Sequence, residues 1–452
     1  MANTYLQRST TTRTNDRKFT YSCWFKRSKI GTGQYFVINL ESGNDRGYIS
    51  FDTADKIFIY DKAGGTERFV ATSNFVLRDT SAWYHLVYSV DSTASSNRTK
   101  IYINGVDRYS DFTVTTAMSQ NVEVGFQKGV VSNGFKIGSQ EAGSTTFSGL
   151  MSHINFVDGL QLDASTFGST DANGVWTIKT SPTVSEYGNN GFFILKDGNS
   201  VTDQSGKGNN FTVGGGTLTK TEDCPSNVFC VLNRLNSDQP TGSVNISNGN
   251  LTFADGENGS NYSYASGTLG ANSGKFYWET KVTDLAEIDQ VGVVLASSNF
   301  MGAANSTGLQ GTAYGGKGCQ FSNGYKVGDG SGGAYMGGFS VNDIMMIALD
   351  LDNNKITFGR NGQWADGSGN ANQTYANSTP AYTNLTAGEF YFPAQAKRAY
   401  GANYGTNHYN FGNGYFQTTA VSSAGTNASG IGIFEYDVPT GYTALSTKGL
   451  NL

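Results

Sequence analysis

Two stretches that lie far apart in the chain, residues 83–105 and 344–362, follow one plan. Each has a long β-rich run, a polar turn, a second alternating run and an Asn-Gly dipeptide. A two-residue type I′ hairpin turn needs φ > 0 at both central residues, and Asn-Gly meets that need well. The plan predicts antiparallel sheets in both halves of the chain. No segment shows sustained 3.6-residue periodicity, so little helix is expected.

Composition supports an all-β fold and excludes several other classes. Gly supplies 59 of 452 residues, near twice the usual ~7%. The glycines have no period of three, which excludes collagen, and 28 Phe with 25 Tyr argue against intrinsic disorder. A formal charge of -5 argues against an electrostatic nucleic-acid binder, which would show a basic stripe. We expect two antiparallel β-sandwiches.

Period-two alternation assigns the two faces of the strand that begins at residue 83. Tyr84, Leu86, Tyr88 and Val90 are predicted to share its buried face, and His85 to point to the opposite face.

Changes in composition and in strand pattern along the chain suggest four parts. A first sandwich is expected over residues 1–180, a structured connector over 181–240, a second sandwich over 241–415 and a C-terminal docking segment over 416–452. The connector contains one strand-like run, Phe192 to Leu195, that could return to the first sandwich. The last segment is expected to pack on a neighbour or on a domain surface.

The four cysteines and the first residues of the chain indicate in which cellular compartment the protein is made. Only Cys224 and Cys230 are close in sequence, and their spacing matches no standard zinc pattern. Reduced thiols in a protein made in a cytoplasm are expected, with a Cys224–Cys230 bridge as the alternative. The first residues contain no apolar core of a signal peptide, and no run of 18 apolar residues predicts a membrane span.

Several pieces in order give the first half a family likeness. Residues 18–168 resemble a laminin-G-like, concanavalin A-like lectin sandwich, or jelly roll. The pieces that carry the resemblance are residues 19–25, 83–86, 100–105, 135–138 and 147–156. Laminin-G-like relatives often bind Ca²⁺, which the resemblance extends to this chain as an expectation.

Residues 243–415 look like a SPRY domain, which is another twisted β-sandwich. The matching pieces are residues 274–280, 291–294, 341–362 and 391–394. Asn342 stands where that family usually has Gly. The resemblance implies partner binding through loops.

The pairing of two such sandwiches is similar to virion proteins of tailed, especially marine, bacteriophages. Residues 183–193, 203–211 and 435–442 share the likeness. The resemblance implies a tail-fibre or capsid-fibre surface protein that is made in the host cytoplasm and contacts other virion proteins. A homotrimer is the state suggested by analogy.

The sequence contains few candidate catalytic residues. Paired carboxylates on one strand, as glycoside hydrolysis needs, are not evident, and the cluster at Asp284, Glu287 and Asp289 is predicted to be a solvated loop. The three histidines, His85, His153 and His408, accompany no Gly-x-Ser-x-Gly elbow. The chain is therefore not expected to be an enzyme, with a depolymerase as a minor alternative.

Ca²⁺ is the only cofactor that the sequence suggests. Asp197, Asn199 and Asp203 cluster oxygen atoms on one turn, and oxygen ligands suit Ca²⁺. Such side chains also cap their own turns, which is the alternative interpretation.

Ligand binding is the leading functional hypothesis. Sugar sites combine an aromatic platform with Asn, Asp or Gln hydrogen bonds. The sequence hypothesis is an adhesin for host cell-surface glycans, and the alternative is a decoration or assembly protein of the capsid or tail. Aromatic residues predicted to lie in exposed loops, with core packing as the alternative for each, are Tyr262, Tyr264, Tyr314, Tyr325, Tyr335 and Trp364.

Overall fold

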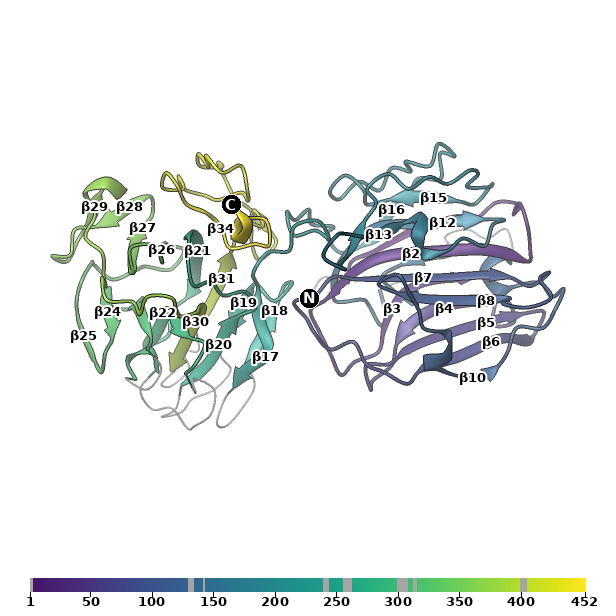
Figure 1. The fold of residues 1–452 in the computed structure, drawn as a ribbon, viewed down its shortest axis with the longest axis horizontal. Coiled ribbons are helices and arrows are strands. Elements are labelled where there is room, and N and C mark those ends of the chain that lie inside the picture. The colour runs from purple at the N-terminus through teal and green to yellow at the C-terminus, as the bar shows by residue number, and fades with distance from the viewer. Residues whose placement is uncertain are drawn as a thin grey trace. The chain divides into compact units, whose positions relative to one another are not determined.

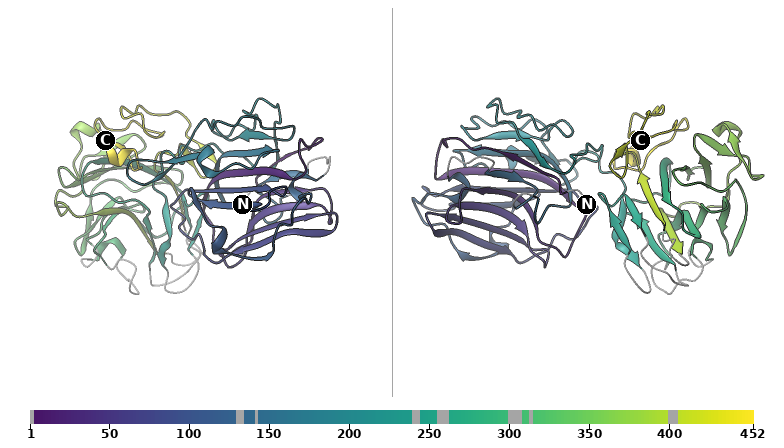
Figure 2. Two further views of the ribbon diagram at one scale, coloured as in Figure 1. Left: turned by 45° about the vertical axis from the view of Figure 1, so that its right-hand side comes forward. Right: turned by 180° about the vertical axis from the view of Figure 1, so that it is seen from behind.

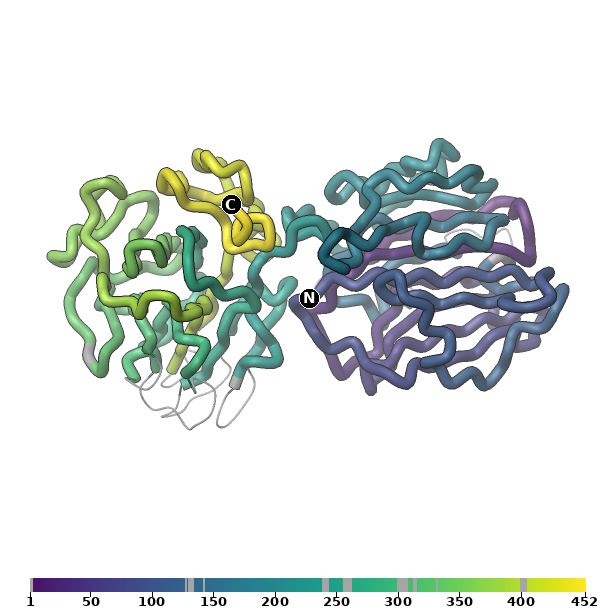
Figure 3. Tube along the Cα trace, viewed as in Figure 1, coloured from purple at the N-terminus to yellow at the C-terminus, as the bar shows by residue number. Residues whose placement is uncertain are grey.

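The protein is described from a computed structural model (Figure 1). The structure describes residues 3–128, 134–140, 143–238, 244–254, 262–298, 308–311, 315–398 and 405–452. These form two compact units, one of residues 1–220 and 224–226, the other of residues 221–223 and 227–452. Figure 3 traces each unit in one continuous range of colour. Within the described ranges the regular elements are β-strands and short 3-10 helices, which confirms the all-β prediction.

The first unit is a sandwich of two antiparallel sheets (Figures 1 and 2). Sheet I has the order β10 (Phe112–Thr116), β6 (Thr66–Ser73), β5 (Ile57–Ala63), β4 (Arg46–Phe51), β3 (Gln34–Leu40), β11 (Phe135–Ile137), β1 (Tyr5–Arg8) and β16 (Thr212–Gly215). Sheet II has the order β15 (Phe192–Ile194), β12 (Gly149–Asp158), β2 (Lys18–Arg27), β7 (Tyr84–Asp91), β8 (Thr99–Ile103) and β9 (Val106–Asp107). The unit also contains a hairpin of β13 (Gly168–Thr170) and β14 (Trp176–Ile178), and the 3-10 helices η1 (Tyr109–Asp111), η2 (Gly125–Gln127) and η3 (Ala164–Thr166).

Alternation along β7 decides which residues enter the core between the sheets. Leu86, Tyr88 and Val90 are fully buried there, and Tyr84 packs against the same core, as the sequence predicts. The following Asn104-Gly105 turn has φ of 49° and 79°, which confirms the predicted hairpin.

The predicted connector is divided between the two units: residues 181–220 belong to the first sandwich, and β17 (Leu232–Asp238) belongs to the second. Its strand β15 pairs with β12, and β16 pairs with β1. The compact unit therefore extends to residue 220, beyond the boundary at 180 that the sequence suggested. The reason is that sheets I and II each complete an edge with a strand from residues 181–220.

The carboxylate of Asp61 is buried in the first core. Its Oδ1 accepts the N–H of Gly125 at 2.7 Å and its Oδ2 accepts the N–H of Phe126 at 3.1 Å, which holds helix η2 against β5. Burial raises the pKa of Asp61 to about 7, although the two N–H groups and Arg68 act in the other direction.

This raised pKa predicts a pH effect on stability. In the unfolded chain an Asp has a pKa of about 3.9, so the folded state holds the Asp61 proton more tightly. The contribution of Asp61 to the free energy of unfolding is present below about pH 4 and is lost as the pH rises through about 7. Between about pH 4 and pH 7 we expect the free energy of unfolding of the wild type, measured with urea, to fall relative to that of Asp61→Asn. Parallel pH profiles would contradict this assignment.

The second unit is a further sandwich, with its core between sheets III and IV. Sheet III has the order β17 (Leu232–Asp238), β20 (Ser263–Gly267), β30 (Tyr391–Arg398), β22 (Ile288–Leu295), β23 (Lys317–Gln320), β24 (Tyr325–Gly328) and β25 (Ser331–Ala334). Sheet IV has the order β18 (Asn245–Ser247), β19 (Thr252–Ala254), β31 (Thr406–Asn410), β21 (Lys275–Asp284), β26 (Ile344–Asp350), β27 (Lys355–Arg360), β28 (Gln363–Ala365) and β29 (Ala371–Gln373), with β34 (Thr443–Ala444) pairing in parallel with β21. Its other elements within the described ranges are the β32 (Tyr415–Phe416) and β33 (Thr419–Ala420) pair and the 3-10 helices η4 (Gly308–Gln310), η6 (Tyr375–Asn377) and η7 (Gly449–Asn451).

The C-terminal segment packs on the outer face of sheet IV. Phe434, Val438 and Tyr442 form a second apolar layer with Tyr277 of β21 and Trp364 of β28. Under this layer the buried carboxylate of Glu279 accepts the N–H of Glu435 at 2.9 Å and of Tyr436 at 2.8 Å. Residues 416–452 are therefore an integral layer of the second unit, not a separate part.

The four cysteines are thiols, with Cys23, Cys230 and Cys319 buried and Cys224 partly exposed. The Cys224–Cys230 bridge is thus not formed. No helix within the described ranges has the length and apolarity to cross a membrane.

Candidate functional site

The structure corrects the prediction of exposed loop positions for four of the six aromatic residues, for which the core-packing alternative holds. These four are buried, with Tyr262 3%, Tyr264 1%, Tyr335 1% and Trp364 4% exposed. Tyr262 and Tyr264 pack with Val294, Leu309 and Val327 over sheet III. Tyr335 belongs to the core, where its hydroxyl donates to Thr379 O, and Trp364 lies beneath the C-terminal segment.

The other two aromatic predictions have different outcomes. Tyr325 is 43% exposed on β24. Tyr314 lies outside the described residues.

The Asp197, Asn199 and Asp203 cluster is organised as a turn. Each carboxylate oxygen of Asp203 accepts two protein donors: Oδ1 the N–H of Phe193 and Ser205, and Oδ2 the Ser205 hydroxyl and the N–H of Asn209. These bonds occupy the lone pairs that a cation would need, so the Ca²⁺ prediction finds no support at Asp203. Asp197 and Asn199 are exposed. Within the described ranges no group of three His, Cys, Asp or Glu side chains could hold a metal.

His85 is buried beside a serine, and its hydrogen bonds define its tautomer. Trp176 Nε1 can only donate, and it lies 3.1 Å from His85 Nδ1, so Nδ1 is the acceptor. Nε2 then carries the proton and donates to Ser22 Oγ at 2.8 Å. A histidine that donates to a serine does not activate it as a nucleophile. Burial lowers the pKa of His85 to about 3, which keeps the ring neutral.

The other two histidines have structural environments as well. His408 is bridged by Thr252 at Nδ1 and Thr283 at Nε2. His153 contacts Ser152 Oγ through Nδ1. Burial lowers the pKa of both rings to about 4, so both are neutral at physiological pH.

The predicted solvated loop at residues 284–289 is only partly a loop. Asp289 lies within β22, where it is fully buried 3.3 Å from Lys397 Nζ. Burial of a carboxylate requires such a partner, which the sequence places more than 100 residues away. Asp284 and Glu287 are exposed.

The outer face of sheet I carries a row of aromatic rings that we name the aromatic row. It consists of Tyr35 on β3, Tyr48 on β4, and Phe58 and Tyr60 on β5. Ring centroids of Tyr35 and Tyr48 are 5.1 Å apart, and those of Tyr48 and Tyr60 are 5.1 Å apart and stacked. Tyr35, Tyr48 and Phe58 are partly exposed, while Tyr60 is 8% exposed.

Strand register explains why these rings meet. Tyr48 pairs with Tyr60, and Ser50 pairs with both Tyr35 and Phe58. Since successive side chains point to opposite faces, Ile49, Ile57 and Ile59 fill the core while the rings face outward. Three adjacent strands thus place their rings on one outer surface.

Polar groups border the aromatic row. The Arg46 guanidinium lies 5.4 Å from the centroid of Tyr60, and register places Lys62 opposite Arg46 and Thr72 opposite Phe58. Burial, and then the neighbouring Tyr35, raise the pKa of Tyr48, so its hydroxyl stays protonated. Flat rings with hydroxyl and guanidinium donors suit a sugar ring, which presents one apolar face and a rim of hydroxyls.

The sequence contained a signal for this row that the aromatic prediction did not use. Residues 57–60 alternate Ile, Phe, Ile, Tyr, which places both aromatics on the face opposite the isoleucines. The prediction considered loops, whereas the rings lie within strands.

The comparisons with known proteins divide along the two units. Residues 1–163 match the model of the concanavalin A-like lectin/glucanases superfamily (Laminin_G_3). The first unit therefore contains a concanavalin A-like domain, as its sequence predicts. No curated protein matches the chain.

Solved structures that are similar to the chain include SPRY domains, the family that residues 243–415 resemble in sequence. The SPRY domain of human HERC1 is 16% identical, with a TM-score of 0.30, over 39% of this chain and 96% of that one. The TRIM65 PSpry domain is 13% identical, with a TM-score of 0.28, over 40% and 91%. Stonustoxin is 14% identical, with a TM-score of 0.29, over 40% of this chain and 27% of its own.

Proposed function

We propose that the protein is a carbohydrate-binding surface protein without enzymatic activity, and that the aromatic row is its binding platform. The observation that carries the proposal is the set of rings on β3, β4 and β5, three of them partly exposed, on the outer face of a concanavalin A-like sandwich. A buried ring would serve the core, but rings that face outward leave apolar surface for a ligand.

The absence of enzymatic activity is part of the proposal. All three histidines are neutral and hydrogen-bonded within the fold, and His85 donates to Ser22 rather than activating it. The row itself offers aromatic, hydroxyl and guanidinium groups, which bind sugars without breaking them.

The resemblance in sequence to virion proteins of tailed bacteriophages extends the proposal to a place of action. The protein would act on the surface of such a particle and bind glycans of the host cell. Several copies on one particle would turn weak single sites into firm attachment, because later contacts form at a high effective concentration.

Substitution of the central ring tests the platform. Tyr48→Ala is expected to weaken binding of the full chain to immobilised bacterial surface polysaccharide by about tenfold. Loss of an aromatic anchor typically costs above ~1 kcal/mol, and 1.4 kcal/mol corresponds to tenfold. Surface plasmon resonance against a panel of purified polysaccharides measures the change.

A matched control separates binding from stability. Tyr109 is also partly buried in the first unit, where it packs near Phe69 away from the row. Tyr109→Ala should leave polysaccharide binding unchanged. The platform is refuted if Tyr48→Ala and Tyr109→Ala bind alike, and the adhesin hypothesis fails if the wild-type chain binds no polysaccharide.

A further inference from the structure

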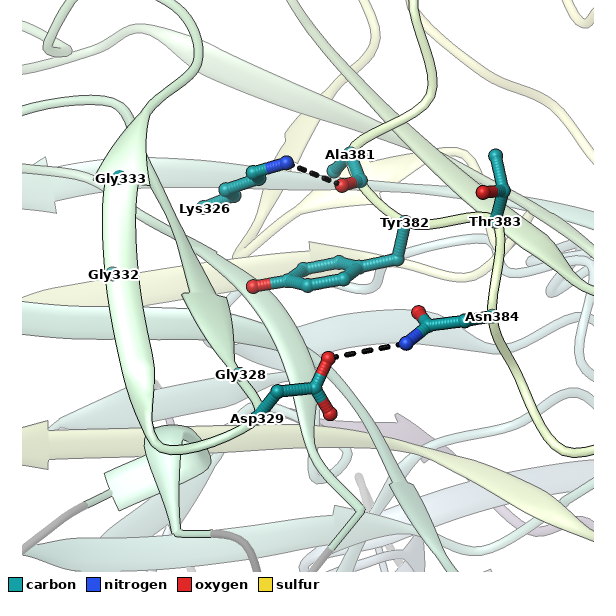
Figure 4. A pocket seen from close by; sticks show the side chains of 9 residues that line it. All are labelled: Lys326, Gly328, Asp329, Gly332, Gly333, Ala381, Tyr382, Thr383 and Asn384. Carbon is teal, nitrogen blue, oxygen red and sulfur yellow. Dashed lines mark hydrogen bonds between the residues drawn. The ribbon is translucent and has the colours of Figure 1, made fainter.

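A pocket of about 350 Å³ lies in the second unit, well away in sequence from the aromatic row. One wall is the β24–β25 hairpin, and the other is the loop that carries Tyr382, Thr383 and Asn384 (Figure 4). The volume lies at the small end of the usual range for ligand pockets, which is about 300–1,000 Å³. It suits one small molecule and not an extended chain.

Glycine residues line the hairpin wall of the pocket, so this wall has no side chains at these positions. Gly332 and Gly333 lie in β25, the last strand of sheet III in the described part of the chain. A Cβ atom added at Gly333 would meet no atom within 4 Å. At Gly333 the backbone therefore borders open space, so a ligand can approach it closely, whereas a Cβ atom at Gly332 would meet Gln310 Nε2 at 3.4 Å.

An ion pair and an amide form the acidic side of the pocket. Asp329 pairs with Lys317, whose side chain is 5% exposed, while the Asp329 side chain is 48% exposed. Asn384 Nδ2 donates to Asp329 Oδ2 at 3.3 Å. Burial would raise the pKa of Asp329, but the bonds from Lys317 and Asn384 outweigh it and lower that pKa. The carboxylate is thus a fixed, ionised acceptor that still faces solvent.

Tyr382 stands between this acidic side and a basic one. Figure 4 shows Lys326 on one side of its ring and Asp329 with Asn384 on the other. Lys326 Nζ lies 5.4 Å from the ring centroid and donates to Ala381 O at 3.1 Å, while Lys317 Nζ lies 5.2 Å from the centroid. The hydroxyl end of the ring points toward the glycine strand, and a Cβ atom added at Gly328 would lie 3.0 Å from the hydroxyl oxygen, so glycine leaves the space beside this hydroxyl.

The groups around the pocket present acceptors and donors in alternation. Asp329 accepts, Lys326 donates, and the Tyr382 hydroxyl does both. An anionic ligand would meet the Asp329 carboxylate, and a cationic one would meet Lys326. A neutral ring with vicinal hydroxyls satisfies both sides, because each hydroxyl can donate and accept.

We propose that this pocket is a second carbohydrate site, which binds one neutral hexopyranose unit by its hydroxyl rim. The site uses different residues from the aromatic row and stands independently of it. Together the two would let one chain hold a glycan through two separate units.

Saturation-transfer NMR on the full chain tests the site with glucose, galactose, mannose and N-acetylglucosamine as probes. A single small ring is expected to bind at a millimolar Kd. Tyr382→Phe removes only the hydroxyl and should reduce the transfer at least several-fold. The control Tyr325→Phe removes a hydroxyl from a 43% exposed tyrosine of the same hairpin and should change nothing.

The outcome separates this site from the proposed platform when the experiment is repeated with the Tyr48→Ala chain. Transfer that survives Tyr48→Ala and falls at least several-fold when Tyr382→Phe is added to that chain supports the pocket, whatever the polysaccharide assay shows. No transfer from any of the four sugars, or equal transfer in Tyr382→Phe and wild type, overturns it. Transfer from galacturonate alone, included as an anionic probe, would overturn the neutral ligand.

Discussion

Replacing Glu279 by glutamine is expected to loosen the C-terminal layer of the second unit by about 3 kcal/mol. The buried carboxylate accepts four donors: Oε1 the Tyr277 hydroxyl at 2.9 Å and the Tyr436 N–H, and Oε2 the Asn410 amide at 3.1 Å and the Glu435 N–H. A glutamine has one acceptor oxygen, so its NH2 group must face donors. At least one backbone N–H then stays buried without a partner, which is costly.

Hydrogen exchange of peptides from residues 421–438 measures this effect. Their protection should fall on the order of 100-fold, since 1.4 kcal/mol corresponds to tenfold. Glu435→Gln is the matched control, because the Glu435 side chain bonds the exposed Ser422 on the same segment. In the Glu435→Gln variant the protection of these peptides should change less than tenfold. Equal effects of the two variants would show that Glu279 does not hold the layer.

Replacing Asp55 by asparagine is expected to destabilise the first unit by about 3–5 kcal/mol. Asp55 Oδ1 lies 2.8 Å from Arg27, whose side chain is 0% exposed, and Asp55 Oδ2 lies 2.9 Å from Arg78. Asparagine tolerates the left-handed φ of 67° at this position, so the change removes mainly the charge. The Arg27 guanidinium, 3.8 Å from the centroid of the Phe51 ring, would then remain buried without a counter-charge.

Two measurements report on this pair. Urea unfolding gives the free energy of unfolding, and hydrogen exchange of peptides from β4 gives the local protection. Asp16→Asn is the control, because Asp16 forms partly exposed ion pairs with Arg13 and Arg17, and ion pairs near the surface contribute about 0–1 kcal/mol. Adding Arg27→Met to Asp55→Asn should recover part of the lost free energy of unfolding, because the double variant no longer buries an unpaired guanidinium. A loss below about 1 kcal/mol in Asp55→Asn would contradict a role for the buried pair.

Local patterns predicted the strands and their faces well. The φ values of 50° and 85° at Asn361 and Gly362 repeat the hairpin seen after β8, and β26 covers Ile344–Asp350 as the apolar run indicated. His85 does lie on the face opposite Leu86, as alternation predicts. These features depend on neighbours in sequence, so the sequence alone contains them.

What covers a sheet face depends on distant residues. Tyr264 was predicted to lie in an exposed loop, but it lies within β20, where Leu309 and Ala396 bury it on the face opposite the core. The aromatic row depends on the pairing of Tyr48 with Tyr60, and the pocket on loop 381–384 meeting β25. Such contacts follow from register and topology, which alternation does not determine. For this reason four of the six aromatic residues that were predicted to be exposed are buried, although the fold class was right.

The C-terminal layer also bears on how this gene could be shortened or recombined. A cut after residue 415, at the end that the sequence suggests for the second sandwich, would uncover the apolar surface of Tyr277, Met346 and Trp364 and strand the Glu279 carboxylate. An exposed patch of that kind favours aggregation. Residues 227–452 therefore fold as one unit, and a shortened chain that is meant to keep the second sandwich should retain the segment from Phe434 to Leu445.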